Sequence, residues 1–407
     1  MKCRGCDSEK TSLLLDLGHS PISNEFLDSL QLLVAEAHYP LKVYVCDRCG
    51  MVQIPEVTRK ESLFSDNYVY FSSYSSSWLN HSKEFASKMI SEYSITNEDL
   101  VLEIASNDGY LLQYFKSSGI RVLGIEPAKS VADVALSKGI ETISAFFGTE
   151  LALELRTKGI SPKIIVANNV LAHVPDIHDF IHGISILLDG EGLATFEFPH
   201  LSNLMELNQF DTVYHEHYSY LSYESLKPIF ATHGLDIFSI ENLTTHGGSL
   251  RLFVAPHDSR AIETHKIENL ESREIIWSPR NSKNAENLRS NALNTKLEFL
   301  SELLNLKKQG LTVAGYGAAA KGNTLLNYCG INSDLISYIV DRNPAKQGKF
   351  LPGSHIPVLS ESIFETMPPN VVIIFPWNLK DEIKLQLSAQ LGSDVKFMVT
   401  APEVQFI

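Results

Sequence analysis

The stretch from Asp211 to Tyr218 consists largely of side chains that can transfer protons or make hydrogen bonds. It reads D-T-V-Y-H-E-H-Y, which places Glu216 between two imidazoles, His215 and His217, beside the phenol of Tyr214. Histidine has an unperturbed pKa of about 6.5, so either ring suits a general base near neutral pH, and Glu216 could orient it. In an extended segment both histidines would lie on the same side, so alternation leaves open which of them is the base.

A metal site is the alternative for this stretch, because histidine and glutamate are both metal ligands. No helix with the pattern H-E-x-x-H is present, and no third ligand is evident beside the two histidines. We therefore interpret the stretch as the site of acid–base chemistry.

Four of the five cysteines form two pairs with the spacing of metal ligands. Cys3-x-x-Cys6 and Cys46-x-x-Cys49 are separated by about forty residues. The N-terminus has no apolar signal region, so we expect a cytoplasmic protein, in which thiols stay reduced and such pairs bind zinc. Four thiolates leave no position for a water molecule, so the sequence predicts one structural zinc.

A third set of residues, from Val101 to Gly109, has the pattern of a cofactor-binding turn. An apolar run that carries Glu103 ends in S-N-D-G, as a buried parallel strand does when it breaks into a tight turn. A helix that follows would offer exposed N–H groups to a ligand. An acid about twenty residues later usually binds ribose hydroxyls. The predicted cofactor contacts are Glu103, Ala105, Asn107, Asp108, Gly109, Glu126 and Pro127.

These residues need a doubly wound sheet to bring them together. We expect strands near 100–105, 121–126, 141–146, 163–168, 192–198, 236–243 and 249–255. The last two flank Thr245-His246-Gly247-Gly248 without room for a crossover helix, so they form an antiparallel pair. Five helix-linked strands followed by such a pair are typical of class I methyltransferases. The absence of G-x-G-x-x-G at the first turn argues against NAD in this domain.

Ligands in such sheets bind at the carboxyl ends of the strands. There, Phe147 could cover an adenine ring, and Asn168 and Asn169 could line the cofactor site. Asn169 and His173 would point together into the cleft if the loop between them coils as one helical turn.

The carboxyl-terminal part repeats the sequence of strand, glycine turn and helix between Thr312 and Gly322. Gly317 and Lys321 could hold a diphosphate, and Asp341 ends the next strand, where it could touch a ribose. A second, smaller Rossmann-like unit is therefore expected, either as a binding domain or as a structural cap. Before it, apolar residues at three- and four-residue steps predict a long helix with one core-facing stripe, formed by Ala285, Leu288, Ala292, Leu293, Leu297, Leu300 and Leu304.

Length and composition limit the protein class. The 407 residues allow two or three domains, and 44% of them are hydrophobic without any apolar run near ~18 residues, so no membrane span is expected. A net charge of −14 disfavours nucleic acid as the main partner. We read Asp16-Leu17-Gly18-His19-Ser20-Pro21 as a loop and Leu41 to Val45 as a strand.

Taken together, these motifs resemble those of the SAM-dependent sugar-nucleotide C-methyltransferases, the deoxysugar C-3 methyltransferases of the mycarose type. The likeness covers nearly the whole chain. It includes the paired cysteines, Tyr68-x-Tyr70, Glu103-Ile104 with Asn107-Asp108-Gly109, Glu126-Pro127, Asn169 with His173, Tyr214-x-Glu216-His217, His246-Gly247-Gly248, Gly315-Tyr316-Gly317-Ala318 with Lys321, and His355-Ile356-Pro357-Val358. The chain departs from the family at Ala105, where glycine is usual.

The resemblance implies an α/β fold in which a class I methyltransferase sheet is flanked by a zinc-binding domain and a C-terminal Rossmann-like domain. We expect a zinc-binding domain at 1–65, a SAM-dependent methyltransferase domain at 66–257, a helical linker at 258–308 and a sugar-nucleotide-binding domain at 309–407. The predicted substrate is a nucleotide-linked 4-keto-6-deoxy sugar, methylated at C-3. No nucleic acid or membrane partner is expected, and the protein should be a monomer or weak dimer.

The resemblance also assigns roles to residues. His217 is the expected base rather than His215, with Glu216, Tyr214, Tyr70 and His173 as catalytic partners. The implied substrate contacts are Tyr68, His246, Gly317, Lys321 and Asp341. Two other functions compete at this point, namely an NAD-dependent nucleotide-sugar oxidoreductase or epimerase, and a zinc-ribbon protein that methylates or binds RNA.

Overall fold

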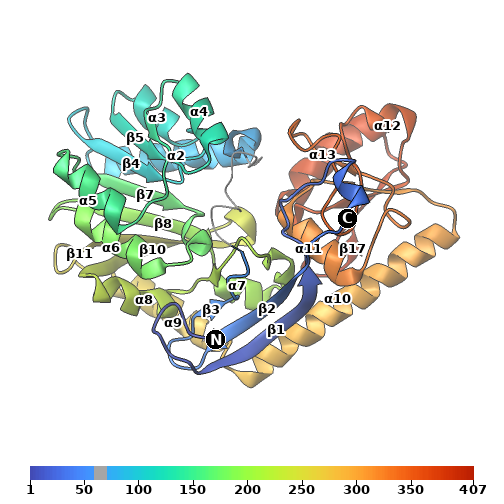
Figure 1. Cartoon of the computed structure of the whole chain (residues 1–407), viewed down its shortest axis with the longest axis horizontal. Coiled ribbons are helices and arrows are strands. Elements are labelled where there is room, and N and C mark those ends of the chain that lie inside the picture. Colours follow the sequence, from blue (N-terminus) through green and yellow to red (C-terminus); the bar gives the residue numbers. More distant parts are fainter. Residues whose placement is uncertain (59–70) are drawn as a thin grey trace. The chain divides into compact units, whose positions relative to one another are not determined.

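The computed structural model describes residues 1–58 and 71–407. The chain folds into two compact units that are each built from several segments (Figure 1). The first comprises Met1–Thr11, Cys46–Leu201 and Tyr218–Ile276, and the second comprises Ser12–Val45, Ser202–His217 and Trp277–Ile407. The loop with the candidate base, 211–217, thus belongs to the same unit as the carboxyl-terminal part of the chain.

The first unit is organised around a seven-stranded sheet with the order β10-β11-β8-β7-β4-β5-β6. Its strands are β4 (Leu100–Ile104), β5 (Arg121–Ile125), β6 (Thr142–Ile143), β7 (Ile164–Asn168), β8 (Leu193–Pro199), β10 (Leu235–Leu243) and β11 (Ser249–Pro256). Strands β4 to β8 are parallel, whereas β11 is antiparallel to both β8 and β10. The predicted class I methyltransferase sheet is therefore confirmed, although β6 is shorter than expected.

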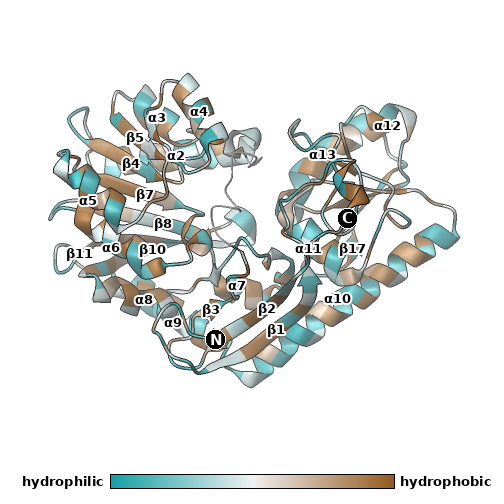
Figure 2. Ribbon diagram, viewed as in Figure 1, coloured by the Kyte–Doolittle hydropathy of each residue, from teal (hydrophilic) through white to brown (hydrophobic). Residues whose placement is uncertain are grey.

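Alternating side chains on the strands bury both faces of this sheet. Leu102 and Ile104 belong to one apolar cluster, and Val101 belongs to another. Figure 2 shows hydrophobic residues along β4 and β7. The covering helices are α2 (Ser76–Glu92), α3 (Leu112–Ser117), α4 (Lys129–Ser137), α5 (Thr149–Thr157), α6 (Ile177–Leu187), α8 (Tyr223–Thr232) and α9 (Thr264–Ile276). Burial on both faces explains why these strands read as nearly continuous apolar runs.

The second unit contains a six-stranded sheet with the order β14-β13-β12-β15-β16-β17. Its strands are β12 (Val313–Tyr316), β13 (Ile339–Val340), β14 (Val358–Leu359), β15 (Val371–Ile374), β16 (Lys396–Val399) and β17 (Gln405–Phe406), of which β17 is antiparallel. Its helices include α10 (Ser282–Lys308), α11 (Ala320–Cys329), α12 (Ile363–Thr366) and α13 (Lys380–Leu391). The predicted Rossmann-like arrangement is confirmed.

Two local predictions were wrong. The segment read as a loop, 16–21, lies largely within β1 (Thr11–Ser20), which pairs with β2 (Tyr39–Cys46). Leu15 and Leu17 are buried while Asp16 is exposed, and Gly18 takes a φ of +79°, so a strand with polar alternate positions here has the composition of a loop. Pairing with a distant strand satisfies its backbone, which local composition cannot predict.

The second error concerns the apolar stripe of α10. The helix buries Ala285, Leu288, Ala292, Thr295, Phe299, Leu303 and Leu306, whereas Leu293, Leu297 and Leu304 are about half exposed. The buried positions follow a 3- and 4-residue spacing of their own, because packing buries one face of the helix, and this face includes Thr295 and Phe299.

None of the helices in the described part of the chain is long and apolar enough to cross a membrane.

Candidate active site and zinc centre

The four paired cysteines meet in one cluster. Their sulfur atoms all lie within 4.8 Å of one another, with 3.5 Å between those of Cys3 and Cys49 and 3.6 Å between those of Cys6 and Cys46. Zinc–sulfur bonds of about 2.3 Å in a tetrahedron place the sulfurs about 3.8 Å apart, so the cluster fits one metal ion. The predicted structural zinc site is confirmed, and the ligand set is closed.

The predicted cofactor turn follows β4 and has an unusual backbone. Ala105, Asn107 and Gly109 adopt φ angles of +54°, +49° and +76°. A Cβ atom at Gly109 would lie 2.3 Å from a methyl group of Ile140, so this position excludes any side chain. The turn brings Ser106, Asn107 and Asp108, all buried, to the carboxyl end of the sheet.

Glu126 ties this turn to the next one. Its Oε2 accepts a hydrogen bond from the backbone N–H of Asn107 at 3.0 Å, and its Oε1 accepts one from that of Ala128, after Pro127, at 2.9 Å. Burial raises the pKa of Glu126 to about 7. Each carboxylate oxygen has a second lone pair, so the same acid can still accept bonds from two ribose hydroxyls.

Several buried acceptors at this edge of the sheet have no hydrogen-bond partner in the described structure: Oδ1 of Asp108, and Oδ1 of Asn168 and Asn169. Glu103 is buried beside them, near the hydroxyl of Tyr110. Burial raises the pKa of Glu103 well above its usual value. SAM presents donors to such a site, namely an ammonium group, two ribose hydroxyls and an adenine amino group. A set of unsatisfied acceptors at the ends of β4 and β7 therefore fits SAM.

Asn169 and His173 do not lie on one continuous helical turn. The 3₁₀ helix η3 (Leu171–His173) forms only after Asn169, which has a φ of +54°. Phe147 packs edge-on against Phe180, with ring centroids 5.3 Å apart, and borders the main apolar cluster. Packing thus accounts for at least part of the role of Phe147.

Ala105 has a left-handed backbone, which strains any residue with a Cβ atom, so the structure gives a physical reason for glycine to be expected at this position. We expect the variant Ala105→Gly to raise the free energy of unfolding by about 0.5–1 kcal/mol. This is the strain that glycine relieves, minus the cost of the greater conformational entropy that glycine has in the unfolded chain. Chemical denaturation measures this change. As a control, Ala132→Gly in the helix α4 should lower stability, and a lower stability of Ala105→Gly would refute the strain.

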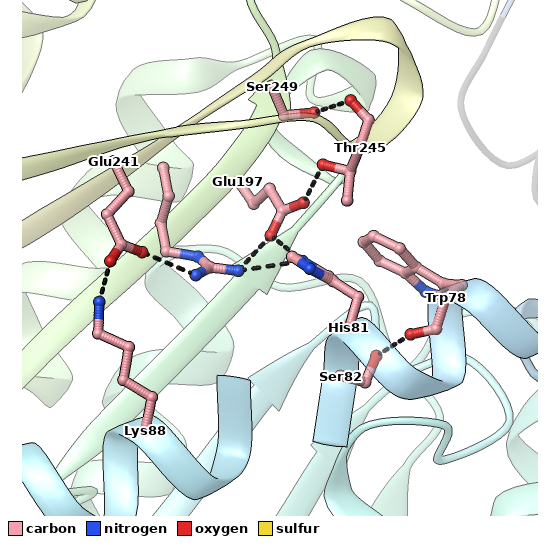
Figure 3. A network of polar contacts seen from close by, with 9 residues as sticks. Trp78, His81, Ser82, Lys88, Glu197, Glu241, Thr245 and Ser249 are labelled. Carbon is pink, nitrogen blue, oxygen red and sulfur yellow. Dashed lines mark hydrogen bonds and ion pairs between the residues drawn. The ribbon is translucent and has the colours of Figure 1, made fainter. Parts of the chain in front are cut away.

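A buried charge network that the sequence reading did not assign to the site lies at the ends of β8 and β11 (Figure 3). The Glu197 carboxylate lies 2.9 Å from Nε2 of His81, bonds to Arg251 and accepts from Thr245 Oγ1 at 2.8 Å. Burial opposes ionisation, but His81 and Arg251 outweigh it and lower the pKa of Glu197 to about 2. In the sequence, this network is indicated only by an acid and an arginine within two otherwise apolar strands.

This network supports the turn that carries His246. Thr245, bonded to Glu197, starts the 3₁₀ helix η5 (Thr245–Gly247), in which His246 has a φ of +53°. The ring of Trp78, in α2, contacts the His246 ring edge-on with 4.9 Å between centroids. The predicted substrate contact His246 is therefore held by its neighbours on two elements.

The loop 211–217 brings His217 and Tyr214 together. The backbone turns between them, with the N–H of His217 donating to the carbonyl of Tyr214 at 3.0 Å. His217 Nε2 lies 2.8 Å from the Tyr214 hydroxyl, and His217 Nδ1 lies 3.2 Å from the carbonyl oxygen of Thr212. Both side chains of the pair are half-buried.

The other residues of the loop face elsewhere, which corrects the expectation that both histidines lie on the same side. The loop is a turn and not an extended segment, so His215 is only 1% exposed and its Nε2 donates to the carbonyl of Pro40 at 3.3 Å. Burial lowers the pKa of His215. The buried Glu216 accepts two hydrogen bonds of 3.0 Å from Asn24, through its backbone N–H and its side-chain amide.

The glycine turn of the second unit is tightly packed. Gly317 has a φ of +85°, and a Cβ atom there would lie 2.4 Å from Pro376. The half-buried Lys321 donates to Asn378 Oδ1 at 2.6 Å and lies over the Trp377 ring. Burial lowers the pKa of Lys321 to about 8, against the opposing charge of Asp211. Asp341 accepts from the backbone N–H of Ala318 at 2.8 Å, which joins the two predicted phosphate- and ribose-binding positions.

Tyr68 and Tyr70 lie outside the described residues.

Three family models match successive parts of the chain: a zinc binding domain at residues 3–64, a methyltransferase domain at 78–240 and a C-methyltransferase C-terminal domain at 244–402. Among curated proteins, C-methyltransferase NovU from Streptomyces niveus is 33% identical over 410 residues, which cover 100% of this chain and 96% of NovU.

Two matching solved structures each cover less than half of this chain. Magnesium protoporphyrin IX methyltransferase from Synechocystis PCC 6803 with bound SAH is 15% identical, with a TM-score of 0.35 over 44% of this chain and 83% of that one. The PH0226 protein from Pyrococcus horikoshii OT3 is 11% identical, with a TM-score of 0.38 over 46% and 95%. On the full-length match to NovU and the three family models, the chain belongs to the SAM-dependent C-methyltransferases that combine a zinc-binding domain, a methyltransferase domain and a C-methyltransferase C-terminal domain.

Proposed function

We propose that this C-methyltransferase acts on a nucleotide-linked 4-keto-6-deoxy sugar and methylates it at C-3, in the biosynthesis of a branched deoxysugar. The observation that carries the proposal is the pair formed by His217 and Tyr214, a base and a neutral donor held 2.8 Å apart. Methylation of a carbon beside a ketone needs both groups. The carbon must first lose a proton, and the ketone oxygen must then carry negative charge.

The proposed chemistry begins with proton removal by His217. The C–H bond at C-3 breaks, the proton moves to Nε2, and the electron pair forms an enolate with the neighbouring ketone. The Tyr214 hydroxyl, which bonds to His217 Nε2 in this structure, would leave that nitrogen when the substrate binds, so that Nε2 can take the proton and Tyr214 can donate to the enolate oxygen. We assign the same donor task to Tyr70 and His173. Bound SAM supplies an activated methyl group, so the protein's own contributions are orientation and proton removal.

The cofactor would be held by the residues at the ends of β4, β5 and β7. We propose that Glu126 binds the ribose hydroxyls, and that Glu103 and Asp108 accept bonds from other donors of SAM. Asn107, Asn168 and Asn169 complete the set. Their unsatisfied or partly used acceptors support this assignment.

We further propose that Lys321, with Gly317, binds the diphosphate of the sugar nucleotide, because a cation beside a glycine turn suits an anion. Replacing Lys321 by Ala should raise the Michaelis constant for the sugar nucleotide about tenfold or more, because one charge-assisted contact is lost. The Michaelis constant for SAM should stay unchanged. Steady-state kinetics with each substrate varied in turn measures both constants. Lys349→Ala, also on the second unit, is the charge-matched control. Equal effects on both substrates would argue against a diphosphate contact.

The substrate class is tested directly with SAM and a panel of nucleotide sugars. We expect a new carbon-bound methyl signal in the NMR spectrum with 4-keto-6-deoxy sugars linked to TDP or GDP. The matching 4-hydroxy sugars should give no product, because without the ketone the C-3 proton is not acidic. Methylation of oxygen, or equal methylation of the 4-hydroxy sugars, would refute the proposal.

A further inference from the structure

We propose that Thr324 and Trp377 are positioning residues that hold the base His217 through the backbone of Asp211–Val213. This inference deepens the proposed function, because it rests on the assignment of His217 as the base. All of these residues belong to the second unit, so the C-terminal Rossmann-like part would orient the base in addition to its proposed binding of the substrate.

A backbone carbonyl group fixes the tautomer of His217. Thr212 O lies 3.2 Å from Nδ1 of His217, and a carbonyl oxygen only accepts hydrogen bonds, so Nδ1 carries the hydrogen atom. In a neutral imidazole the other nitrogen, Nε2, then holds the lone pair, and the Tyr214 hydroxyl donates to it at 2.8 Å. If the Thr212 carbonyl were displaced, this tautomer of His217 would lose its stabilising hydrogen bond, and the basic nitrogen Nε2 would be held less firmly in its direction.

Side chains from distant parts of the sequence fix the residues on both sides of Thr212. Asp211 is buried, and its Oδ2 accepts from Trp377 Nε1 at 2.7 Å. The carbonyl of the buried Val213 accepts from Thr324 Oγ1 at 2.8 Å. Thr324 lies in α11, and Trp377 begins the 3₁₀ helix η6 (Trp377–Leu379) just after β15.

Charge strengthens the first of these contacts. Burial raises the pKa of Asp211 to about 6, while Lys321 and the Trp377 hydrogen bond favour its ionised form. Lys321 is three residues before Thr324 on α11, so one helix presents both the charge and the hydroxyl to the segment. A misplacement of about 1 Å at a reacting group can lower a rate on the order of 100-fold, so loss of either contact should be visible in catalysis.

The test compares Thr324→Val, Thr324→Ser and Trp377→Phe with the parent protein. Thr324→Val keeps the shape but removes the hydroxyl, Thr324→Ser restores the hydroxyl, and Trp377→Phe removes the indole N–H. Thr295→Val is the matched control, because Thr295 is also buried in the second unit but bonds to the Asn208 side chain, outside the 211–213 segment.

Two readouts are measured: deuterium exchange at C-3 of the keto-sugar nucleotide with S-adenosylhomocysteine bound, and the tautomer of His217 in nitrogen-15 NMR spectra. We expect Thr324→Val and Trp377→Phe to exchange at least tenfold more slowly and to lose the preference for hydrogen on Nδ1. Thr324→Ser and Thr295→Val should match the parent in both.

Parental exchange and an unchanged tautomer in both Thr324→Val and Trp377→Phe would overturn the proposal. So would equal losses in Thr295→Val, which would indicate a general effect of destabilisation. If the parent itself exchanges nothing, the proposed substrate is wrong, and the His217 tautomer in the same variants still decides whether Thr324 and Trp377 position the ring.

Discussion

Replacing His217 by Ala is expected to slow deuterium exchange at C-3 of the keto-sugar nucleotide by on the order of 10²- to 10⁴-fold. The reason is that the imidazole supplies the lone pair that takes the proton, and Tyr214, its partner at 2.8 Å, is a weak base in its neutral form. Exchange is measured by NMR in deuterium oxide with S-adenosylhomocysteine bound, so that methyl transfer cannot mask it.

His215→Ala is the control for this experiment, since it removes an equal ring two residues away. His215 is buried against Pro40 and Tyr39, so the variant should lose stability and keep most of the exchange rate. A variant His217→Ala that exchanges as fast as the parent, beside a slow His215→Ala, would show that the base is misassigned.

Removing the zinc ion is expected to release the two cysteine knuckles from the first unit. Structural zinc contributes an apparent free energy of about 10–16 kcal/mol in small zinc-binding peptides, which is comparable to the whole stability of a typical domain. Gly5, between Cys3 and Cys6, packs against Met51 and Ile229, and its carbonyl lies 3.1 Å from Nε2 of His178. Loss of the metal should therefore also loosen α6 and α8.

Cys46→Ser is the sharpest form of this test, with metal content measured by mass spectrometry and protection of residues 1–58 by hydrogen exchange. We expect loss of stoichiometric zinc and of protection at both knuckles. Cys329→Ser changes a buried cysteine outside the cluster and should keep the metal. Full zinc and parental protection in Cys46→Ser would contradict a four-thiolate site.

Repetitive and local features were predictable from the sequence. The apolar runs from 100 to 256 predicted all seven strands, because a strand buried on both faces leaves little room for polar residues, and Glu103 stood out within one of them. The paired cysteines predicted their own cluster, because two residues between thiols form a turn that brings both sulfurs to one metal.

Contacts between distant segments were not predictable in the same way. Glu197 and Arg251 lie opposite each other on β8 and β11, a pairing that depends on the register of two strands more than fifty residues apart in the chain. The wrongly predicted stripe of α10 has the same origin, because its leucines were all apolar and only packing chose among them.

In the loop 211–217, the sequence determines the kind of chemistry and the tertiary structure determines which residues can carry it out. Its residue types alone indicated acid–base chemistry, since imidazole, phenol and carboxylate have that chemistry wherever they lie. The tertiary structure decided which imidazole can serve, because a turn between Tyr214 and His217 pairs those two side chains, whereas Pro40 and Asn24 bind His215 and Glu216. Such a choice depends on hydrogen-bond partners nearly two hundred residues away, and no local pattern of sequence contains them.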